Sequence, residues 1–311
     1  MLSSGVPEQI APPDDSTAVG TGKGGVGKST VAAHLAAASA ESGKRTLLIC
    51  VTGQDDDDLG IKSHNRGDQP PGDSALDGQG LYKAIHDRVP LQPIREVRPN
   101  LDVLPGGPRV AEVRDLLLMR ALKEGPGVAL SLARSLAPIA PLYDRVLFDS
   151  APEDDTLEQL VLAATRNLVV PTRSDGSSIR GMDRISKNFW TVKNAVNPAL
   201  RLAGVFLYAS NPNATVMHDA VREEVRETLG SGIAILESIV GYREVPARRA
   251  RKKGLTFGEY AALLPQAASV ADVKAGRAKE EDMVPPSTPG LAKEMSQLTD
   301  EIFERCARGV A

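Results

Sequence analysis

Cysteine and aromatic residues are scarce in this sequence. Its 311 residues include two cysteines and one tryptophan, and aromatic residues make up 4% of the chain. Cys50 and Cys306 lie far apart and belong to no Cys-x-x-Cys or Cys/His grouping, which argues against a disulfide scaffold, a zinc site and an iron–sulfur cluster. Scarce, ungrouped cysteines suit a reducing compartment, so we expect a cytoplasmic protein.

Long apolar runs and a strong charge imbalance are also missing. No uninterrupted apolar stretch approaches the roughly 20 residues that a membrane helix needs. The N-terminus, MLSSGVPEQIAPPDDS, has no basic region followed by an apolar run, so we expect a soluble chain that is not exported. The net charge of −3 does not mark the whole molecule as a polyanion binder, so any contact with nucleic acid must come from a local patch.

The order of the apolar segments predicts an α/β fold. Residues 1–15 are rich in Pro, Ser and Asp and are expected to form a disordered lead-in, with a single domain over residues 16–311. In that domain, short β-branched or leucine-rich runs alternate with alanine-rich segments of helix length. This alternation indicates a doubly wound, mostly parallel sheet flanked by helices. The predicted strands are residues 17–20, 46–51, 101–104, 145–149, 167–171, 202–209 and 233–240.

Two stretches interrupt this alternation. Residues 55–80 hold four consecutive aspartates, two prolines and five glycines, which predicts a long surface loop. Residues 269–290 form a second irregular segment, followed by a closing helix at 291–309. The apolar residues of that helix, Leu291, Met295, Leu298, Ile302 and Phe303, recur at helical spacing. A membrane anchor is one use of such a helix, but its mixture of acids and bases favours packing on the domain.

The strongest motif is the run GTGKGGVGKST, which fits the P-loop pattern G-x-x-x-x-G-K-[ST] when Gly22 opens it. Glycines let consecutive backbone amides turn toward phosphate oxygens, and the helix that follows directs its positive end at the same anion. Lys28 adds a positive charge, Ser29 supplies a hydroxyl for Mg²⁺, and Thr30 can donate to an inner phosphate. The predicted phosphate-binding residues are Gly24, Gly25, Val26, Gly27, Lys28, Ser29 and Thr30.

A strand that ends in an acid is expected to complete the metal site. The segment YDRVLFDSAP places Asp149 at the carboxyl end of a buried strand, beside the P-loop in a doubly wound sheet. A carboxylate there can hold Mg²⁺ through water, as Ser29 holds it through its hydroxyl. The alternative is that Asp149 only caps the helix that starts near Asp154.

The octet KGGVGKST resembles the P-loop of the deviant-Walker ATPases, which include ParA, MinD, the arsenite-pump ATPase and nitrogenase iron protein. In that group the early lysine reaches the partner's phosphates across a dimer interface. The resemblance therefore implies that ATP joins two subunits face to face and that hydrolysis releases them. It assigns catalytic roles to Lys23, Lys28 and Asp149. Outside such an octet, Lys23 would be an ordinary solvated lysine.

The resemblance to ParA proteins spans nearly the whole chain from Ser16. The blocks GLYKAI and PNLDVLPGG resemble the ParA segment between switch I and the third strand, and DSAPEDDTLEQLVLAATRNLVVPT resembles the Walker B block. GYREVPARRARKKGLTFGEYA stands where ParA proteins carry residues that contact nonspecific DNA. The resemblance implies a plasmid or chromosome partition ATPase, associated with the nucleoid and stimulated by a ParB-like centromere-binding protein.

The last block is a dense positive segment in an otherwise acidic chain. A phosphate backbone is a natural partner for it, and an ATP-bound homodimer would present it twice. A solvated basic turn, or one that docks an acidic partner, is the alternative. The candidate DNA contacts are Arg243, Arg248, Arg249, Arg251, Lys252 and Lys253.

The sequence departs from the ParA pattern after its second strand. ParA proteins usually carry Asp-x-Asp-Pro-Gln there, and the second aspartate positions the attacking water. The segment LLICVTGQDDDD puts Thr52 in its place, and a hydroxyl cannot accept a proton from water as a carboxylate can. Either hydrolysis is very slow, or one aspartate of residues 55–58 takes over. Asn211 stands about where relatives contact adenine, but Asn-Pro is also an ordinary start of a turn.

These features predict a ParA-type ATPase that binds ATP and Mg²⁺, dimerises with ATP, binds nonspecific DNA and segregates it without membrane contact. One alternative is a MinD-like positioning ATPase that acts at membranes or protein assemblies. The other is a nucleotide-dependent scaffold that is impaired in hydrolysis.

Overall fold

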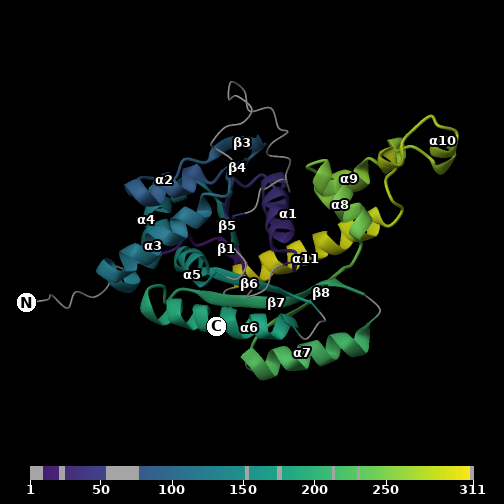
Figure 1. Ribbon diagram of the computed structural model, residues 1–311. Coiled ribbons are helices and arrows are strands. Elements are labelled where there is room, and N and C mark those ends of the chain that lie inside the picture. Colours follow the sequence, from purple (N-terminus) through teal and green to yellow (C-terminus); the bar gives the residue numbers. More distant parts are fainter. Residues whose placement is uncertain are drawn as a thin grey trace, which may run out of the picture.

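The computed structural model describes residues 10–20, 25–53, 77–150, 154–173, 177–211, 214–229 and 232–308. Within these residues, eight strands form one sheet in the order β3-β4-β2-β5-β1-β6-β7-β8 (Figure 1). The strands are β1 Ser16–Val19, β2 Thr46–Val51, β3 Ile94–Arg98, β4 Leu101–Leu104, β5 Arg145–Ser150, β6 Asn167–Thr172, β7 Arg201–Ser210 and β8 Ile235–Gly241. Neighbouring strands run parallel except β3, which pairs with β4 antiparallel.

Helices cover both faces of this sheet. The α-helices are α1 Lys28–Glu41, α2 Gln79–Asp87, α3 Val110–Glu124, α4 Ser131–Leu136, α5 Asp155–Ala164, α6 Ser177–Ala195, α7 Thr215–Leu229, α8 Glu244–Lys252, α9 Phe257–Ala262, α10 Val270–Lys274 and α11 Thr288–Arg308. Short 3₁₀ helices include η2 Gly125–Leu130 and η5 Glu280–Asp282. None of the described helices is long and apolar enough to cross a bilayer.

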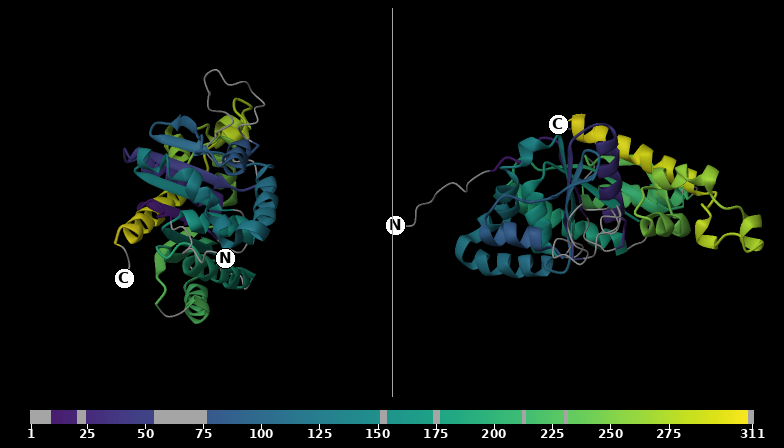
Figure 2. Two further views of the ribbon diagram at one scale, coloured as in Figure 1. Left: turned by 90° about the vertical axis from the view of Figure 1, so that its left-hand side faces the viewer. Right: turned by 90° about the horizontal axis from the view of Figure 1, so that it is seen from above.

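Two apolar cores lie on opposite faces of the sheet. One core joins the sheet to α2, α3, α4, α5, α6 and α7, and the other joins it to α1, α8, α9 and α11. Figure 2 shows the resulting layers, with the sheet between the two sets of helices. Strands β1, β2, β5 and β6 are buried along their whole length, because helices exclude water from both of their faces. The doubly wound fold expected from the sequence is therefore confirmed.

All seven predicted strands are present, and their ends differ from the prediction by at most two residues. The sequence analysis missed β3, an edge strand of sequence IREVR. Only Val97 among its side chains is buried, and the register against β4 shifts within the strand. An exposed edge strand needs no apolar alternation, so hydrophobic patterning gave no signal for it.

The predicted irregular segments are partly helical. Residues 54–76 lie outside the described residues, and α2 already begins at Gln79, inside the predicted loop 55–80. The segment 269–290 contains α10, whose start is fixed by a capping box between Ser269 and Asp272. The closing helix begins at Thr288, three residues before the predicted start. Helix α10 was missed because a helix of five residues lacks the long apolar period that the prediction relied on.

Residues ahead of β1 already contact the domain. Asp15, in the predicted lead-in, accepts hydrogen bonds from Arg145 Nε at 2.9 Å and Nη2 at 2.8 Å and from Lys44 Nζ at 3.3 Å. The folded part of the chain therefore begins before Ser16. Helix α11 lies along the sheet with Leu291, Met295 and further apolar residues buried against it.

Candidate nucleotide site

The P-loop connects the central strand β1 to helix α1. Residues 21–24, including Lys23 and Gly24, lie outside the described residues. Gly25 and Gly27 both have positive φ, 73° and 86°, a backbone conformation that strains any residue with a Cβ. Gly27 is the N-cap of α1, so no capping side chain takes up the first amides of the helix. Those amides can donate to an anion, and the helix dipole favours a negative charge at this place.

Space at the two glycines differs in a way that suits a phosphate cradle. A Cβ at Gly25 would meet nothing within 4 Å, whereas a Cβ at Gly27 would lie 2.1 Å from Cε1 of Tyr208. Tyr208 comes from β7, so its ring packs against the loop just before α1. The loop is thus open on the Gly25 side and supported on the Gly27 side. A side chain at Gly27 would collide with this ring, so the end of the loop next to α1 requires glycine.

The three residues that follow the loop lie at the start of α1. Lys28 is 6% exposed, Ser29 and Thr30 are half-buried, and Val26 before them is buried. All of them come after the central strand β1 in the chain. Strand β1 lies between β5 and β6, at the point where the strand order reverses. Ligands of doubly wound folds bind at that point, outside the carboxyl ends of the strands. The structure therefore places these P-loop residues where a nucleotide phosphate would bind.

Asp149 lies at the same edge of the sheet. It is the next-to-last residue of β5, its backbone is in register with Val19 and Cys50, and its side chain is 1% exposed. The helix-capping role considered for it belongs to Asp154, whose side chain accepts from the Leu157 amide at 3.0 Å. A buried carboxylate next to the P-loop strand can accept hydrogen bonds from the waters of hydrated Mg²⁺, so the residues present fit a nucleotide with its metal.

Thr52 directly follows β2 and lies at this edge too. It is 2% exposed, and its carbonyl accepts from the Gly107 amide at 2.8 Å. The neighbouring aspartates, residues 55–58, lie outside the described residues. At the position where the ParA pattern has a carboxylate, the described structure thus holds a buried, neutral side chain.

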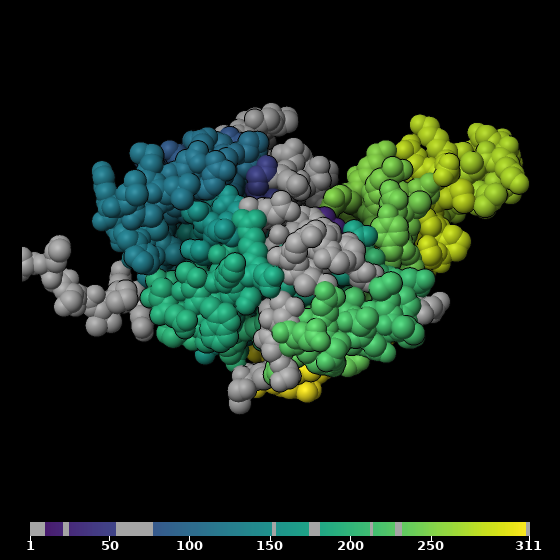
Figure 3. All heavy atoms as spheres, turned by 60° about the horizontal axis from the view of Figure 1, so that its bottom comes forward, coloured from purple at the N-terminus to yellow at the C-terminus, as the bar shows by residue number. Residues whose placement is uncertain are grey.

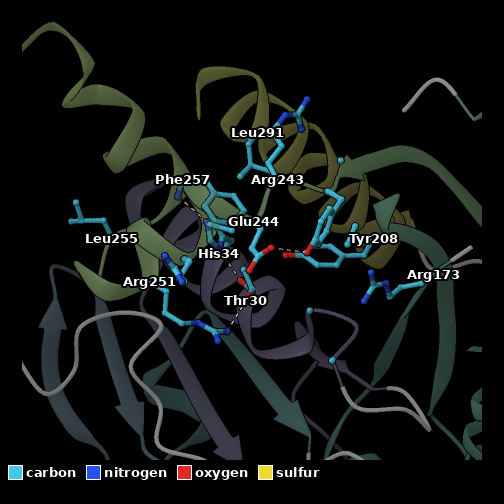
Figure 4. A pocket seen from close by; sticks show the side chains of 17 residues that line it. Thr30, His34, Arg173, Tyr208, Arg243, Glu244, Arg251, Leu255, Phe257 and Leu291 are labelled. Atoms are coloured by element: carbon cyan, nitrogen blue, oxygen red, sulfur yellow. Dashed lines mark hydrogen bonds between the residues drawn. The ribbon is translucent and has the colours of Figure 1, made fainter. Parts of the chain in front are cut away.

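A cavity of about 410 Å³ adjoins the P-loop, with Gly25, Gly27 and Thr30 among its lining residues (Figure 4). Its volume lies in the range of small-molecule sites. Side chains line it from several elements: Thr30 and His34 from α1, Tyr208 from β7, residues that follow β6 and β8, the segment α8–α9, and Leu291 from α11. Asn211 is not among its lining residues, and the Asn211 carbonyl accepts from the Ala214 amide at 3.0 Å, as expected of a turn.

Sequence reasoning missed most of the cavity wall. Tyr208, Tyr242 and Glu244 line it, and the Tyr242 hydroxyl donates to the Glu244 carboxylate at 3.1 Å. The available signal was their position, since each follows or ends a parallel strand. The carboxyl ends of such strands converge on one edge of the sheet.

Four of the six predicted DNA-binding residues bond to other residues of this chain. Arg243 forms two hydrogen bonds to Glu294 of α11, at 2.5 and 2.7 Å, and Arg249 pairs with Glu280 at 2.9 Å. Lys252 pairs with Glu281 at 3.2 Å, and Arg251 Nη2 donates to the Thr30 hydroxyl at 3.2 Å. Arg248 and Lys253 are exposed, and neither pairs with a carboxylate of another described residue.

The structure therefore places the six basic residues in three settings. Three of them pair with acids, Arg251 is directed at the P-loop helix, and Arg248 and Lys253 remain at the surface. Figure 3 shows the segment that contains α9 and α10, in yellow-green, as a lobe at one end of the molecule. Because η5 supplies Glu280 and Glu281 to this lobe, its positive charge is smaller than the sequence suggested.

A buried carboxyl near Lys28 was also missed. Glu158 of α5 is 3% exposed, and Asn188 Nδ2 donates to it at 2.5 Å and to Asp155 at 2.8 Å. Burial raises the pKa of Glu158 from 4.5 to about 7, against the opposing effects of the Asn188 hydrogen bond and of positive charges that include Lys28. Its carboxyl therefore changes charge near neutral pH.

Comparison with protein families agrees with this geometry. A family model described as an AAA domain matches residues 16–202, more than half of the chain. The chromosome partitioning protein ParA of Myxococcus xanthus is 30% identical over 209 residues, which cover 66% of this chain and 68% of that protein. The chromosome-partitioning ATPase Soj of Thermus thermophilus is 27% identical over 249 residues, covering 79% of this chain and 88% of that protein.

Solved structures share the fold at lower identity. Apo McdA of Cyanothece has a TM-score of 0.67 and 15% identity, covering 92% of this chain and 98% of that one. Cobyrinic acid a,c-diamide synthase of Mycobacterium smegmatis, solved with bound ADP and magnesium, has a TM-score of 0.60 and 22% identity, covering 81% and 95%. The family match, the ParA relative and the strand–P-loop–helix geometry agree, so this chain belongs to the ParA family of P-loop ATPases.

Proposed function

We propose that this chain is a ParA-type partition ATPase. ATP with Mg²⁺ joins two copies of the chain face to face, and this dimer binds nonspecific DNA. Hydrolysis of ATP then separates the two copies. The observation that carries the proposal is that one edge of the sheet brings together the P-loop, the buried Asp149 and a nucleoside-sized cavity walled by the basic segment. A nucleotide bound there would contact the segment proposed to bind DNA.

Each P-loop residue has a proposed role. The amides of Gly24 to Gly27 and the ammonium of Lys28 hold the phosphates, while Lys23 reaches the phosphates of the second copy. Mg²⁺, when bound, neutralises charge on the outer phosphates, and Ser29 and Asp149 hold it. Thr30 donates to an inner phosphate, and Asn211 contacts the base. The relatives named as ATPases and the structure solved with ADP and magnesium support this assignment.

The proposed DNA surface is centred on the C-terminal end of α8. Arg248 and Lys253 contact DNA phosphates directly. Lys252 also contacts a DNA phosphate, after it releases its ion pair with Glu281. Arg243 and Arg249 support this surface through their bonds to Glu294 and Glu280. Two such surfaces on a dimer would bind a polyanion more tightly than one surface on a monomer.

The cellular setting follows from the same proposal. The ATPase acts in the cytoplasm, bound to the nucleoid, and a ParB-like centromere-binding protein stimulates its hydrolysis. The relatives named as chromosome partitioning proteins support this setting.

DNA retention in three nucleotide states tests the proposal. Retention on nonspecific duplex DNA should be strong with ATP and weak with ADP or without nucleotide. The logarithm of affinity should fall by roughly 0.9 per log unit of salt for each phosphate neutralised. Replacing both Lys252 and Lys253 by Glu should abolish retention while ATP binding persists, because neither residue lines the nucleotide cavity. Arg277→Glu, in an exposed pair with Asp272, is the matched control. Equal retention in all three states contradicts the proposal.

A hydrolysis-impaired scaffold is the second candidate, and the buried Thr52 favours it. Such a protein would bind ATP, dimerise and hold DNA without turnover. Phosphate release with saturating DNA and partner separates the two candidates. Turnover that depends on Asp149 supports the ATPase, whereas dimerisation without phosphate release supports the scaffold. Thr52→Asp should then raise the rate of phosphate release.

A further inference from the structure

Arg251 points from α8 into the nucleotide cavity. Its Nη2 donates to the hydroxyl of Thr30 at 3.2 Å, and Figure 4 shows its side chain directed from α8 toward α1. Thr30 lies in the first turn of α1, two residues after Lys28. The guanidinium therefore lies where an inner phosphate would meet the end of the P-loop.

A second contact fixes the segment that carries Arg251. The amide of Phe257, at the start of α9, donates to Nε2 of His34 at 2.9 Å. Because Nε2 accepts this bond, the ring proton is on Nδ1, which donates to the Thr30 carbonyl at 2.7 Å. The His34 and Phe257 rings also pack with their centroids 4.2 Å apart. The chain from α8 to α9 is thus held against α1 at two residues one helical turn apart.

The charges around the cavity favour an anionic ligand. Its described lining residues include four arginines, Arg173, Arg243, Arg248 and Arg251, and one carboxylate, that of Glu244. Arg243 is already neutralised by Glu294, and Glu244 accepts from the hydroxyl of Tyr242. The remaining arginines give the wall a net positive charge.

We propose that Arg251 is a nucleotide-binding residue whose guanidinium binds the inner phosphate beside Thr30. The inference rests on the proposed function, since it assumes that the P-loop takes a nucleoside di- or triphosphate. Guanidinium has five donors in a planar fork, so Arg251 can bond to a phosphate oxygen while it keeps Thr30. In this proposal Arg251 connects α8 to the bound nucleotide and does not contact DNA, although DNA contact is the role that the sequence suggested for it.

The inner phosphate is common to ATP and ADP, which makes the proposal testable by titration calorimetry. Arg251→Ala should weaken ATP and ADP by the same factor, roughly 10-fold or more, because a charge-assisted hydrogen bond is lost from both complexes. Arg251→Lys keeps the positive charge but not the planar set of donors, so it should lose less affinity for both nucleotides than Arg251→Ala does. Arg277→Ala, which also removes an exposed, paired arginine, should bind both nucleotides as the wild type does.

Thermal unfolding without nucleotide verifies that each variant is folded before titration. Binding of ATP and ADP by Arg251→Ala at wild-type affinity overturns the inference while the proposed function stands. If only the binding of ATP becomes weaker, the inference is also overturned, because that result assigns Arg251 to the outer phosphate. A wild type that binds neither nucleotide overturns the proposed function as well.

Discussion

At the scale of single residues, Gly27 combines two demands that only glycine meets. Its φ of 86° strains a residue with a side chain by about 1–2 kcal/mol, and a Cβ there would also strike the Tyr208 ring. Gly27→Ala should therefore destabilise the protein more than Gly25→Ala, where φ is 73° and the added Cβ meets nothing within 4 Å. Urea unfolding without nucleotide measures the difference.

A double-mutant cycle locates the cause of that difference. In a Tyr208→Ala background, Gly27→Ala should cost no more than Gly25→Ala, because the ring is gone. An equal loss at both glycines in the wild-type background would contradict the steric role of Tyr208.

The buried Glu158 makes stability depend on pH. Its pKa is raised from 4.5 to about 7 by burial, so the folded protein binds a proton that the unfolded chain releases between these values. The corresponding stability is fully present below about pH 4.5 and is lost as pH rises through 7. Glu158→Gln has no such proton, so its free energy of unfolding relative to wild type should rise from pH 5 to pH 8 by an amount on the order of 1–3 kcal/mol.

Denaturant midpoints at pH 5, 6, 7 and 8 follow this change. Glu223→Gln on α7, an exposed glutamate, is the control and should show no comparable trend. A constant difference between Glu158→Gln and wild type across this range would mean that the carboxyl is ionised throughout.

The positions of the candidate phosphate-site residues in the fold were predictable, because each belongs to a motif with fixed spacing. Lys28, Ser29 and Asp149 lie at the edge of the sheet that their positions after β-strands required. The opposite cavity wall was not predictable, since Tyr208 and Glu244 converge only through the register of β7 and β8. For the same reason, the sequence alone could not reveal that Arg251 reaches the hydroxyl of Thr30.

At the scale of elements, helix α11 holds the basic helix α8 in place. Glu294 of α11 accepts from both Nη atoms of Arg243 and from the Gly241 amide at 2.8 Å, so it joins the end of β8 and the start of α8 to α11. This ion pair is about four-fifths buried, with 24% and 19% of the two side chains exposed. Removing one partner leaves the other charge poorly solvated.

Glu294→Ala should therefore lower the free energy of unfolding by about 1–3 kcal/mol. Glu304→Ala on the same helix breaks only an exposed pair with Arg308 and should cost less than about 0.5 kcal/mol. Chemical unfolding of both variants provides the comparison. Similar small losses would show that the Glu294 bonds do not stabilise the junction.

Among the elements, long apolar ones were predicted well and short or edge elements poorly. Strands β2, β5 and β6 each contain an unbroken apolar run, LLICV, VLF and LVV, as expected of strands that are covered on both faces. Strand β3 and helix α10 are mostly exposed and are determined by backbone pairing and by capping, which leave little trace in hydrophobicity.

At the scale of the whole molecule, the site and the basic segment share one edge of the sheet. The P-loop lies at the centre of this edge, and α8 reaches it from beyond β8, the last strand of the sheet. A nucleotide between them would contact residues far apart in sequence, Thr30 and Arg251. The fold thus offers a direct physical link between nucleotide occupancy and the surface on α8 that is proposed to bind DNA.

The central claim is that a nucleoside triphosphate binds at the P-loop and joins two copies of this chain. Light scattering after gel filtration, with ATP and Mg²⁺, with ADP and without nucleotide, tests it most directly. We predict that the mass doubles with ATP only, and that Lys28→Ala stays monomeric in every condition. A wild-type mass that is the same in all three conditions would contradict the account.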